Sequence, residues 1–497
     1  MQDIIKGLIL LLQFKNIFFL FAGVLSGIIV GALPGMGGIL IITLILPFTY
    51  SMRPDTAMSL LIAVYCGSVY AGCVSGILFN IPGTGSGAAS SIDGHELAKK
   101  GRAGDALAYS AASSFIGGVI GALICLTFAP LVARLALLFG AAEYSVLAFF
   151  GITIIASVSQ GSLLKGLIGG FFGILLGTVG MGANTGYFRY TFGFLELADG
   201  INMVWGITGL FAFSQAFQLC KTEDLESGIA FNVEKFSFKH YYNKILKVMA
   251  KHKMLILKSG IVGAVIGAIP GTGAEIASWI AYNEAKRENS KIGTGEEAGV
   301  IAPEVANNAC IGGALIPTLT LGIPGSSTMS LILGGLMLAG LRPGFRLFSE
   351  QGPYVYSIIF SIIVSSAIFF VLGLLVVPYL AKLTSVPIGI LIPMIIALAT
   401  IGAFTARFSL FGVYISLVIG VIAYFFRVNE VPIPPVILGL ILGPIVEEHL
   451  ARALIISNGS LKVFFTGYIN IFLWFAIVLS VGITIYNEYK VKLNDVK

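Results

Sequence analysis

Gly31-Ala32-Leu33-Pro34-Gly35-Met36-Gly37, in the first half of this chain, returns as Gly267-Ala268-Ile269-Pro270-Gly271-Thr272-Gly273 in the second half. A second phrase repeats as well: Asn80-Ile81-Pro82-Gly83-Thr84 returns as Gly322-Ile323-Pro324-Gly325-Ser326. Proline removes a backbone donor and glycine frees the backbone, so all four phrases should interrupt helices. Each lies in an apolar stretch, where broken backbone survives only if protein or a watery cavity surrounds it. Paired breaks in two halves of a membrane protein therefore predict a transport site.

The composition assigns the chain to a membrane. Hydrophobic residues make up 57% and charged residues 11%, and the mean hydropathy of +0.95 excludes an ordinary water-soluble protein. Long apolar runs recur along the chain and predict roughly 12 spans. Strand-like alternation is missing, which favours helices over a barrel. We predict an all-α polytopic membrane protein with broken or re-entrant helices at the Pro-Gly phrases.

The repeated phrases also predict how the chain is organised. We expect a first membrane repeat over residues 1–220 and a second over 259–497, inverted because inversion makes alternating access natural. Residues 221–258 form the longest polar interruption, with eight lysines against four acids. The positive-inside bias places this linker in the cytoplasm. Its aromatic and aliphatic residues alternate with lysines, which predicts an amphipathic helix on the membrane surface; a solvated connector is the alternative.

The broken helix ends supply the chemistry of the predicted site. Free N–H groups at one end attract carboxylates, and free carbonyls at the other can coordinate sodium. Hydroxyls and amides bind either ion without the desolvation cost of a fixed charge. The expected substrate-binding residues are Pro34, Gly35, Gly37, Pro82, Gly83, Thr84, Ser86, Pro270, Gly271, Thr272, Gly273, Asn307, Asn308, Pro324, Gly325, Ser326, Ser327 and Thr328. The expected ion-binding residues are Asn307, Asn308, Thr320 and Glu275.

Ionisable residues near apolar segments are a second set of candidates, because charge inside a membrane is expensive and usually functional. They are Asp93, Glu143, Arg189, Glu275 and Glu304, and Glu275 or Glu304 would suit a proton-driven mechanism. The alternative is that they lie at water-exposed ends of segments. The five cysteines have no CxxC spacing, so we expect neither a disulfide nor a bound metal other than sodium, and no cofactor.

Three other interpretations compete with a transport site. Glycine and proline could merely kink packed helices, and broken helices could also line a channel-like pore. Ser86 could act as the nucleophile of an intramembrane serine hydrolase, with His95 or His449 as its base. ATP hydrolysis is not expected, because the chain has no GxxxxGK[ST] phrase. The net charge of +6 is modest, and the basic residues lie mostly in polar loops, so nucleic-acid binding is not expected either.

One long stretch carries a family resemblance. It reads Ala302-Pro303-Glu304-Val305-Ala306-Asn307-Asn308-Ala309, then Gly312-Gly313-Ala314-Leu315-Ile316-Pro317 and Thr320-Leu321-Gly322-Ile323-Pro324-Gly325-Ser326. Together with Asn80-Ile81-Pro82-Gly83 and Pro270-Gly271-Thr272-Gly273-Ala274, it resembles the large membrane subunit of tripartite tricarboxylate transporters, the TctA family. The similarity covers most of the chain in the same order.

The resemblance implies a function that hydropathy alone does not. It implies a secondary transporter in the cytoplasmic (inner) membrane of a bacterium or archaeon, working with a small membrane subunit and a periplasmic solute-binding protein. Such a transporter takes up carboxylates such as citrate, driven by a gradient of sodium ions or protons. Asn307 and Asn308 precede the second Pro-Gly phrase where Tyr65 and Cys66 precede the first. We therefore expect the second copy to carry more of the polar recognition.

Overall fold

The computed structural model describes residues 2–33, 37–158, 162–182, 186–221, 238–375 and 388–495. Pro34, Gly35 and the linker residues 222–237 lie outside this part of the chain. The chain divides into two compact units, one formed by residues 1–133 and 223–391 and the other by 134–222 and 392–497. Each unit thus takes a segment from each half of the sequence. The proposed division into two repeats concerns sequence equivalence and stays a prediction.

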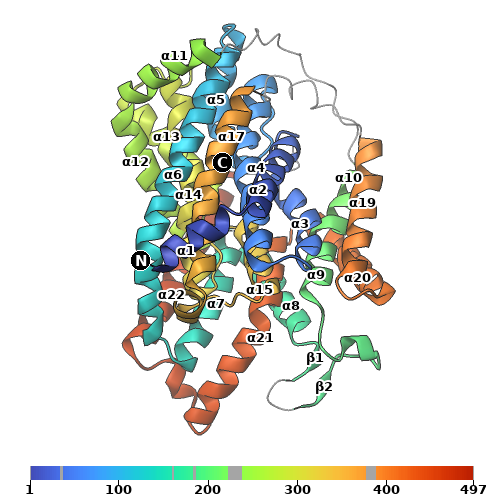
Figure 1. Cartoon of the computed structure of the whole chain (residues 1–497). Helices are drawn as coiled ribbons and strands as arrows, with labels where there is room; N and C mark the ends of the chain where they lie inside the picture. The colour runs from blue at the N-terminus through green and yellow to red at the C-terminus, as the bar shows by residue number, and fades with distance from the viewer. Residues whose placement is uncertain are drawn as a thin grey trace. The chain divides into compact units, whose positions relative to one another are not determined.

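The described residues are almost entirely helical (Figure 1). Within the described part of the chain, eight helices are long and apolar enough to cross a membrane, and five shorter apolar helices accompany them. This confirms the predicted class, an all-α polytopic membrane protein. The first unit holds most of α6 and all of the other elements named next: α1 (Gln2–Leu11), α2 (Phe14–Gly31), α3 (Gly37–Thr49), α4 (Pro54–Phe79), η1 (Gly85–Gly87), α5 (Ala88–Lys99), α6 (Ala103–Leu135), α11 (Phe238–Lys251), α12 (Lys253–Ala268), α13 (Gly273–Glu288), α14 (Glu297–Leu321), α15 (Ser327–Leu338), α16 (Phe345–Glu350) and α17 (Gly352–Leu375).

The second unit is built around helices α8 and α21, which approach closely because both carry glycine. A methyl group on Gly439 would lie 2.2 Å from the carbonyl oxygen of Gly170 on the facing helix. A two-stranded antiparallel sheet pairs Gly180 with Arg189. The unit's elements, most of α19 included, are η2 (Ala136–Leu138), α7 (Ala141–Val158), α8 (Leu163–Gly177), β1 (Gly180–Met181), β2 (Phe188–Arg189), η3 (Leu195–Leu197), α9 (Met203–Ile207), the π-helical turn η4 (Thr208–Phe213), α10 (Ser214–Leu219), α19 (Ile388–Thr405), α20 (Leu410–Val428), α21 (Ile433–Ile456), η5 (Leu461–Phe464) and α22 (Tyr468–Asp495).

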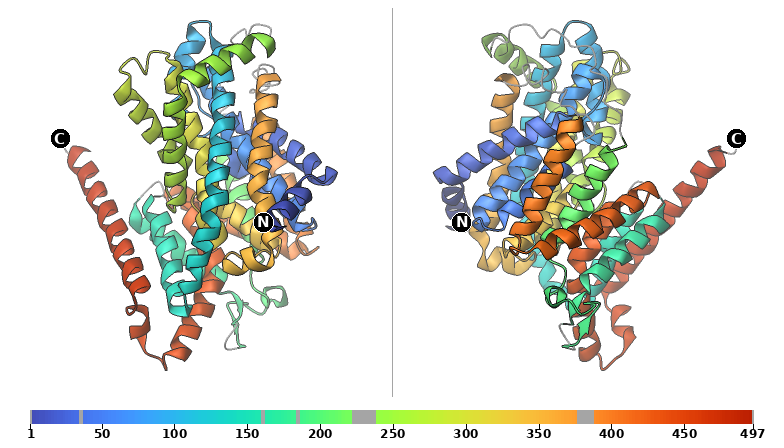
Figure 2. Two further views of the ribbon diagram at one scale, coloured as in Figure 1. Left: turned by 60° about the vertical axis from the view of Figure 1, so that its left-hand side comes forward. Right: turned by 90° about the vertical axis from the view of Figure 1, so that its right-hand side faces the viewer.

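Polar contacts join the segments of the second unit that are distant in sequence. Trp205 donates a hydrogen bond of 3.0 Å to the carbonyl oxygen of Ala403. Lys165 pairs with Glu430 at 2.8 Å, and this contact lowers the pKa of the Glu430 carboxyl. The last helix, α22, runs as one continuous helix to the C-terminal end of the described chain (Figure 2).

Two central helices of the first unit, α4 and α14, differ from every other span. Their hydropathy windows are 100% buried, whereas the other six long spans are 12–61% buried. Helix α2 packs along α4, and α12 packs along α14. The helix backbones approach closely because glycine lies at both interfaces. A methyl group on Gly27 would lie 2.4 Å from the Val64 carbonyl oxygen, and one on Gly263 would lie 2.2 Å from the Ala306 carbonyl oxygen. Such small-residue seams are typical of helices packed in membranes.

Both central helices end at a Pro-Gly phrase, as the sequence predicts. Helix α4 ends in Asn80, which adopts a left-handed conformation with φ 58°, and α14 ends in Gly322 with φ 71°. The chain then passes through an irregular segment before the next helix begins. We call residues 80–84 the first break and residues 322–326 the second break. Helices α12 and α13 are likewise interrupted at residues 269–272.

Candidate functional site

The second break meets the interruption between α12 and α13. Gly271 donates its backbone N–H to the carbonyl oxygen of Gly325 at 3.1 Å. Gly273 has φ +69°, and a methyl group there would lie 3.7 Å from the Ser326 Cβ. Ser326 is buried and caps α15, because its hydroxyl accepts a bond from the Met329 N–H. Two predicted site segments therefore adjoin in space.

The residue that follows the first break touches the start of α13. A methyl group on Gly85 would lie 2.4 Å from Glu275 Oε1 and 2.5 Å from its Cδ, so the carboxylate lies directly against this backbone. Gly83 donates its N–H to the Gly72 carbonyl oxygen at 2.9 Å. The hydroxyls of Thr84 and Ser86 are 3.1 Å apart. The first unit thus brings Glu275 and the predicted hydroxyls to one place.

Two asparagines of α14 are buried with unused polar atoms. Asn307 and Asn308 have no exposed surface. Neither side-chain atom of Asn307 has a hydrogen-bond partner among the described residues, and the same holds for Asn308 Oδ1. Asn308 Nδ2 donates to the Glu304 carbonyl oxygen at 3.0 Å. Buried polar groups are normally paired, and leaving an amide unpaired costs roughly 1–3 kcal/mol. These amides are therefore candidates for contact with a ligand.

Tyr65 is the counterpart of Asn307 in the sequence repeat, and it faces the second break. Its hydroxyl lies 3.5 Å from the Ser326 hydroxyl, at the outer limit of a hydrogen bond. Both residues are buried. Helix α4 of the first half therefore reaches the break of the second half, just as η1 of the first half contacts α13 of the second half. The candidate site is assembled from both halves of the sequence.

The remaining predicted residues contribute less. The Thr272 hydroxyl donates within its own turn, to the carbonyl oxygens of Ile266 at 2.6 Å and Ile269 at 2.8 Å. Thr320 donates to a carbonyl oxygen of its own helix. Residues that shape the backbone or begin a helix are Gly37, Pro82, Pro270, Pro324, Ser327 and Thr328.

Glu304 is a buried carboxylate that three helices surround. It has no exposed surface, and its two oxygens accept hydrogen bonds from Ser90 at 2.6 Å and Ser114 at 2.8 Å. The serines belong to α5 and α6, and the thiol of Cys73 reaches the same carboxylate from α4. Sequence reasoning selected Glu304 but missed Ser114. The available signal was the polar cluster Ser110, Ser113 and Ser114 inside an apolar run.

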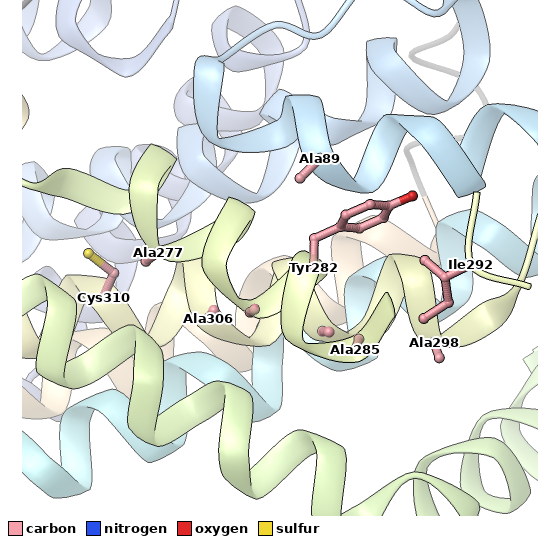
Figure 3. Close-up of a cluster of buried hydrophobic side chains, with 10 residues drawn as sticks. Ala89, Ala277, Tyr282, Ala285, Ile292, Ala298, Ala306 and Cys310 are labelled. Carbon is pink, nitrogen blue, oxygen red and sulfur yellow. The ribbon is translucent and has the colours of Figure 1, made fainter. Parts of the chain in front are cut away.

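Asp93 is another buried carboxylate of the first unit, and most of its hydrogen-bond donors are backbone N–H groups. Its carboxylate accepts the backbone N–H groups of Gly293, Gly295 and Glu296 at 2.8–2.9 Å and the Tyr282 hydroxyl at 2.9 Å. The Tyr282 ring covers an alanine-rich cluster of α5, α13 and α14 (Figure 3). Asp93 thus fixes the turn between α13 and α14 to α5, and we call this arrangement the Asp93 clamp.

Two other ionisable candidates lie in the second unit and are paired there. Arg189 binds Glu447 at 2.9 Å, and Glu143 accepts the Gly140 N–H at 2.9 Å and an amide N–H of Asn470 at 3.3 Å. Among the described residues, no group of three or more His, Cys, Asp or Glu side chains could hold a metal ion.

The residues of the hydrolase alternative have other partners. His95 Nδ1 lies 3.1 Å from the Ile77 carbonyl oxygen, and the Ser86 hydroxyl pairs with Thr84. His449 belongs to the second unit, where its ring stacks on Tyr144 with 4.9 Å between centroids.

Comparison with known proteins identifies the family. Residues 17–438 match the tripartite tricarboxylate transporter TctA family. The chain belongs to this family. Two relatives from Agrobacterium vitis are similar to it: an uncharacterized 52.8 kDa protein in the TAR-I ttuC' 3' region is 36% identical over 491 residues, covering 97% of this chain and 95% of that protein. An uncharacterized protein in the TAR-II ttuC' 3' region is 37% identical over 208 residues, covering 41% of this chain and 86% of that protein.

Membership in the TctA family confirms the resemblance seen in the sequence. The chain is a multi-pass membrane protein of a transporter family, and the family indicates the large subunit of a tripartite system. No solved structure matches the chain. The geometry of the first unit is therefore described from this chain alone.

Proposed function

We propose that this TctA-family chain is the permease subunit that imports a di- or tricarboxylate, driven by a sodium or proton gradient. It works in the inner membrane with a small membrane subunit and a periplasmic solute-binding protein, and it needs no cofactor and catalyses no reaction. The family match supports the class of system. The observation that carries the proposal is that residues 271–275 contact both the second break, at Gly325, and Gly85, which follows the first break. Asn307, on α14 of the same unit, contributes unpaired amide atoms.

The chemistry of these groups suits an anion. Backbone N–H groups at the start of helices carry partial positive charge and bind carboxylates. Ser326 precedes α15 and Ser327 and Thr328 begin it, whereas Thr84 precedes η1 and Ser86 lies within it. Asn307 adds both a donor and an acceptor. The carboxylate of Glu275 lies against η1 and disfavours a substrate anion there, so we assign the substrate carboxylates to the second break.

The matched backbone contacts of the two halves support the repeat that the mechanism requires. Gly83 approaches the Gly31 carbonyl oxygen as Gly325 approaches that of Gly267, with distances of 2.2 and 2.5 Å for a methyl group. A movement that exchanges the two arrangements would give alternating access. The linker, with helix α11 in it, would lie at the cytoplasmic surface.

Transport in membrane vesicles tests the proposal. The chain and its two partner subunits are reconstituted, and uptake of radiolabelled citrate and a panel of other carboxylates is measured under imposed sodium or proton gradients. We expect saturable accumulation that depends on the binding protein and on one gradient. Gly83→Val and Gly325→Val should abolish it, whereas Gly482→Val, in open space on α22, should not. Uptake indifferent to both gradients and to the binding protein would instead indicate a pore.

A further inference from the structure

The feature that carries a further inference is the isolated charge of Glu304. Its carboxylate is completely buried in the first unit, and both oxygens face hydroxyl groups. No lysine or arginine in the described part of the chain lies within ion-pair distance of it. The titratable side chains that interact with it are Cys73, by a hydrogen bond, and Tyr70, both on α4. From helices α5 and α6, the hydroxyls of Ser90 and Ser114 donate to the carboxylate.

A lone ionised carboxylate at this depth is expensive. Buried charges are paired, bind a cation or become neutral, because the desolvation penalty is otherwise several kcal/mol. The sequence repeat shows that packing does not demand the charge. When Pro82 is aligned with Pro324, Glu304 corresponds to Ile62 and Ser90 to Ile332, and both isoleucines are buried. In the sequence repeat, two buried isoleucines therefore stand at the positions of Glu304 and Ser90.

A second observation points to a bound ion beside this carboxylate. Asn308 lies one helical turn from Glu304 on α14, is fully buried, and has an unpaired Oδ1. Its Nδ2 donates a hydrogen bond to the backbone carbonyl oxygen of Glu304. The amide is therefore held against the helical turn that carries Glu304. Carboxylate, hydroxyl and amide oxygens are the ligands that hard cations prefer.

We propose that Glu304, Ser90 and Ser114 form the binding site of the coupling cation, one proton or one sodium ion, with the Asn308 amide as a further ligand. This inference rests on the proposed carboxylate import and names the ion site of that function. A bound monovalent cation neutralises the buried carboxylate. The site has a single negative charge, so it holds one such cation and is unsuited to a divalent metal.

Ser90 connects this site to the first break. Its hydroxyl lies 2.6 Å from Glu304 Oε1 and 3.0 Å from the Gly87 carbonyl oxygen, where η1 ends. A hydroxyl has one hydrogen, so it donates to only one of these acceptors at a time. With the site empty, it donates to the charged carboxylate. With the cation bound, Ser90 offers its oxygen to the cation or to the protonated acid and donates to Gly87. Cation binding is thereby transmitted to the backbone that follows the break.

Reconstituted vesicles test this coupling. Citrate accumulation by the full tripartite system is measured with a pH gradient alone and with a sodium gradient alone, which identifies the cation. Glu304→Gln keeps the size and hydrogen bonds of the neutral acid. We expect it to lower gradient-driven accumulation at least about tenfold, within the usual range of coupling between sites, while citrate exchange without a gradient continues. Glu288→Gln, an exposed partner of Lys258, is the matched control.

Ser90→Ala removes one ligand of the site together with its link to Gly87. It should weaken cation binding, which Glu304 and Ser114 still support, and abolish gradient-driven accumulation. Gradient-driven accumulation by Glu304→Gln equal to that of the parent protein would overturn the proposal.

A stability measurement that does not involve transport distinguishes failure of the cation site from failure of the proposed carboxylate import. The purified full-length chain should unfold at a higher temperature when the coupling cation is supplied, as protons or as sodium in place of choline, because a ligand of the folded state stabilises it. Glu304→Gln should lose this dependence. If no carboxylate is transported but the dependence is present and needs Glu304, the cation site stands and the carboxylate import is wrong. If the parent protein shows no cation dependence, the site is wrong.

Discussion

The two central helices of the first unit share a backbone plan and differ in what they bury. Helices α4 and α14 both receive a glycine-rich helix along one side, and both end in a left-handed residue before a Pro-Gly break. Helix α4 has Ile62 and Tyr65 where α14 has Glu304 and Asn307. The backbone plan serves the breaks in both halves. Buried polar atoms without a hydrogen-bond partner among the described residues include the hydroxyls of Tyr70 and Ser75 on α4, whereas on α14 they are amide atoms of Asn307 and Asn308. A site that binds both an ion and a substrate requires different polar side chains on the two helices, even where their backbones follow the same plan.

A second pair of positions shows the same inequality. Asp93 and Tyr282 form the Asp93 clamp, and their counterparts in the repeat are Gly335 and Leu46. A methyl group on Gly335 would lie 3.1 Å from Leu46 Cδ1, so the two positions adjoin in the other copy as well. One copy is held by hydrogen bonds to a charged group and the other by apolar contact. The polar clamp therefore ties the α13–α14 turn to α5 by hydrogen bonds that the other copy does not have at the equivalent positions.

Removing the clamp should have the largest effect. Asp93→Ala leaves three backbone N–H groups and the Tyr282 hydroxyl without their acceptor, and we expect a loss of roughly 3–5 kcal/mol in stability. Thermal unfolding in detergent measures it. Gly335→Ala at the equivalent position should cost less, because the nearest atoms are ends of leucine side chains. Equal losses for the two variants would show that the clamp adds nothing beyond packing.

The close glycine contacts should respond alike in both copies. Gly83→Ala and Gly325→Ala each place a methyl group within 2.5 Å of a backbone carbonyl oxygen, which cannot give way as a side chain can. We expect each to lose about 1–3 kcal/mol, the usual cost of overpacking. Gly482→Ala, with nothing within 4 Å, is the control and should not be destabilised. A large loss for one copy alone would refute the shared backbone plan.

The unpaired amide of Asn307 should cost stability and serve function. Asn307→Leu replaces a buried group without hydrogen-bond partners by an apolar side chain of similar size. We expect the purified protein to become more stable by about 1–2 kcal/mol, because an unsatisfied polar group is removed. Citrate accumulation in vesicles should fall. A destabilised variant would mean that the amide has a structural partner, and an active one would exclude it from the site.

Tyr65→Phe should have the smallest effect. The hydroxyl makes one contact, 3.5 Å from Ser326, which is too long for a strong hydrogen bond. We expect a change below about 0.5 kcal/mol in stability and less than a twofold change in citrate uptake. The comparison with Asn307→Leu then measures how unequal the two copies are. Loss of transport in Tyr65→Phe comparable to that in Asn307→Leu would show that both copies recognise substrate.

Much of the fold and the general place of the site could be read from the sequence. Apolar composition leaves a helical bundle as the expected solution, since every backbone group at membrane depth must be paired. Glycine and proline act on their own backbone, so Pro82 and Pro324 mark breaks without knowledge of neighbours. The repeated phrases also predict Ser326 and Asn307 as site residues, and this assignment stays a prediction.

Only the tertiary structure decided which polar groups are paired. Asp93 and Glu304 are both buried carboxylates in the same unit, and nothing in their local sequence tells them apart. Asp93 receives backbone N–H donors from a turn about 200 residues away in sequence, whereas the oxygen donors to Glu304 in the described part of the chain are the side-chain hydroxyls of Ser90 and Ser114. The energy of a buried charge depends on what other helices bring to it. That pairing is set by packing, which sequence spacing does not encode.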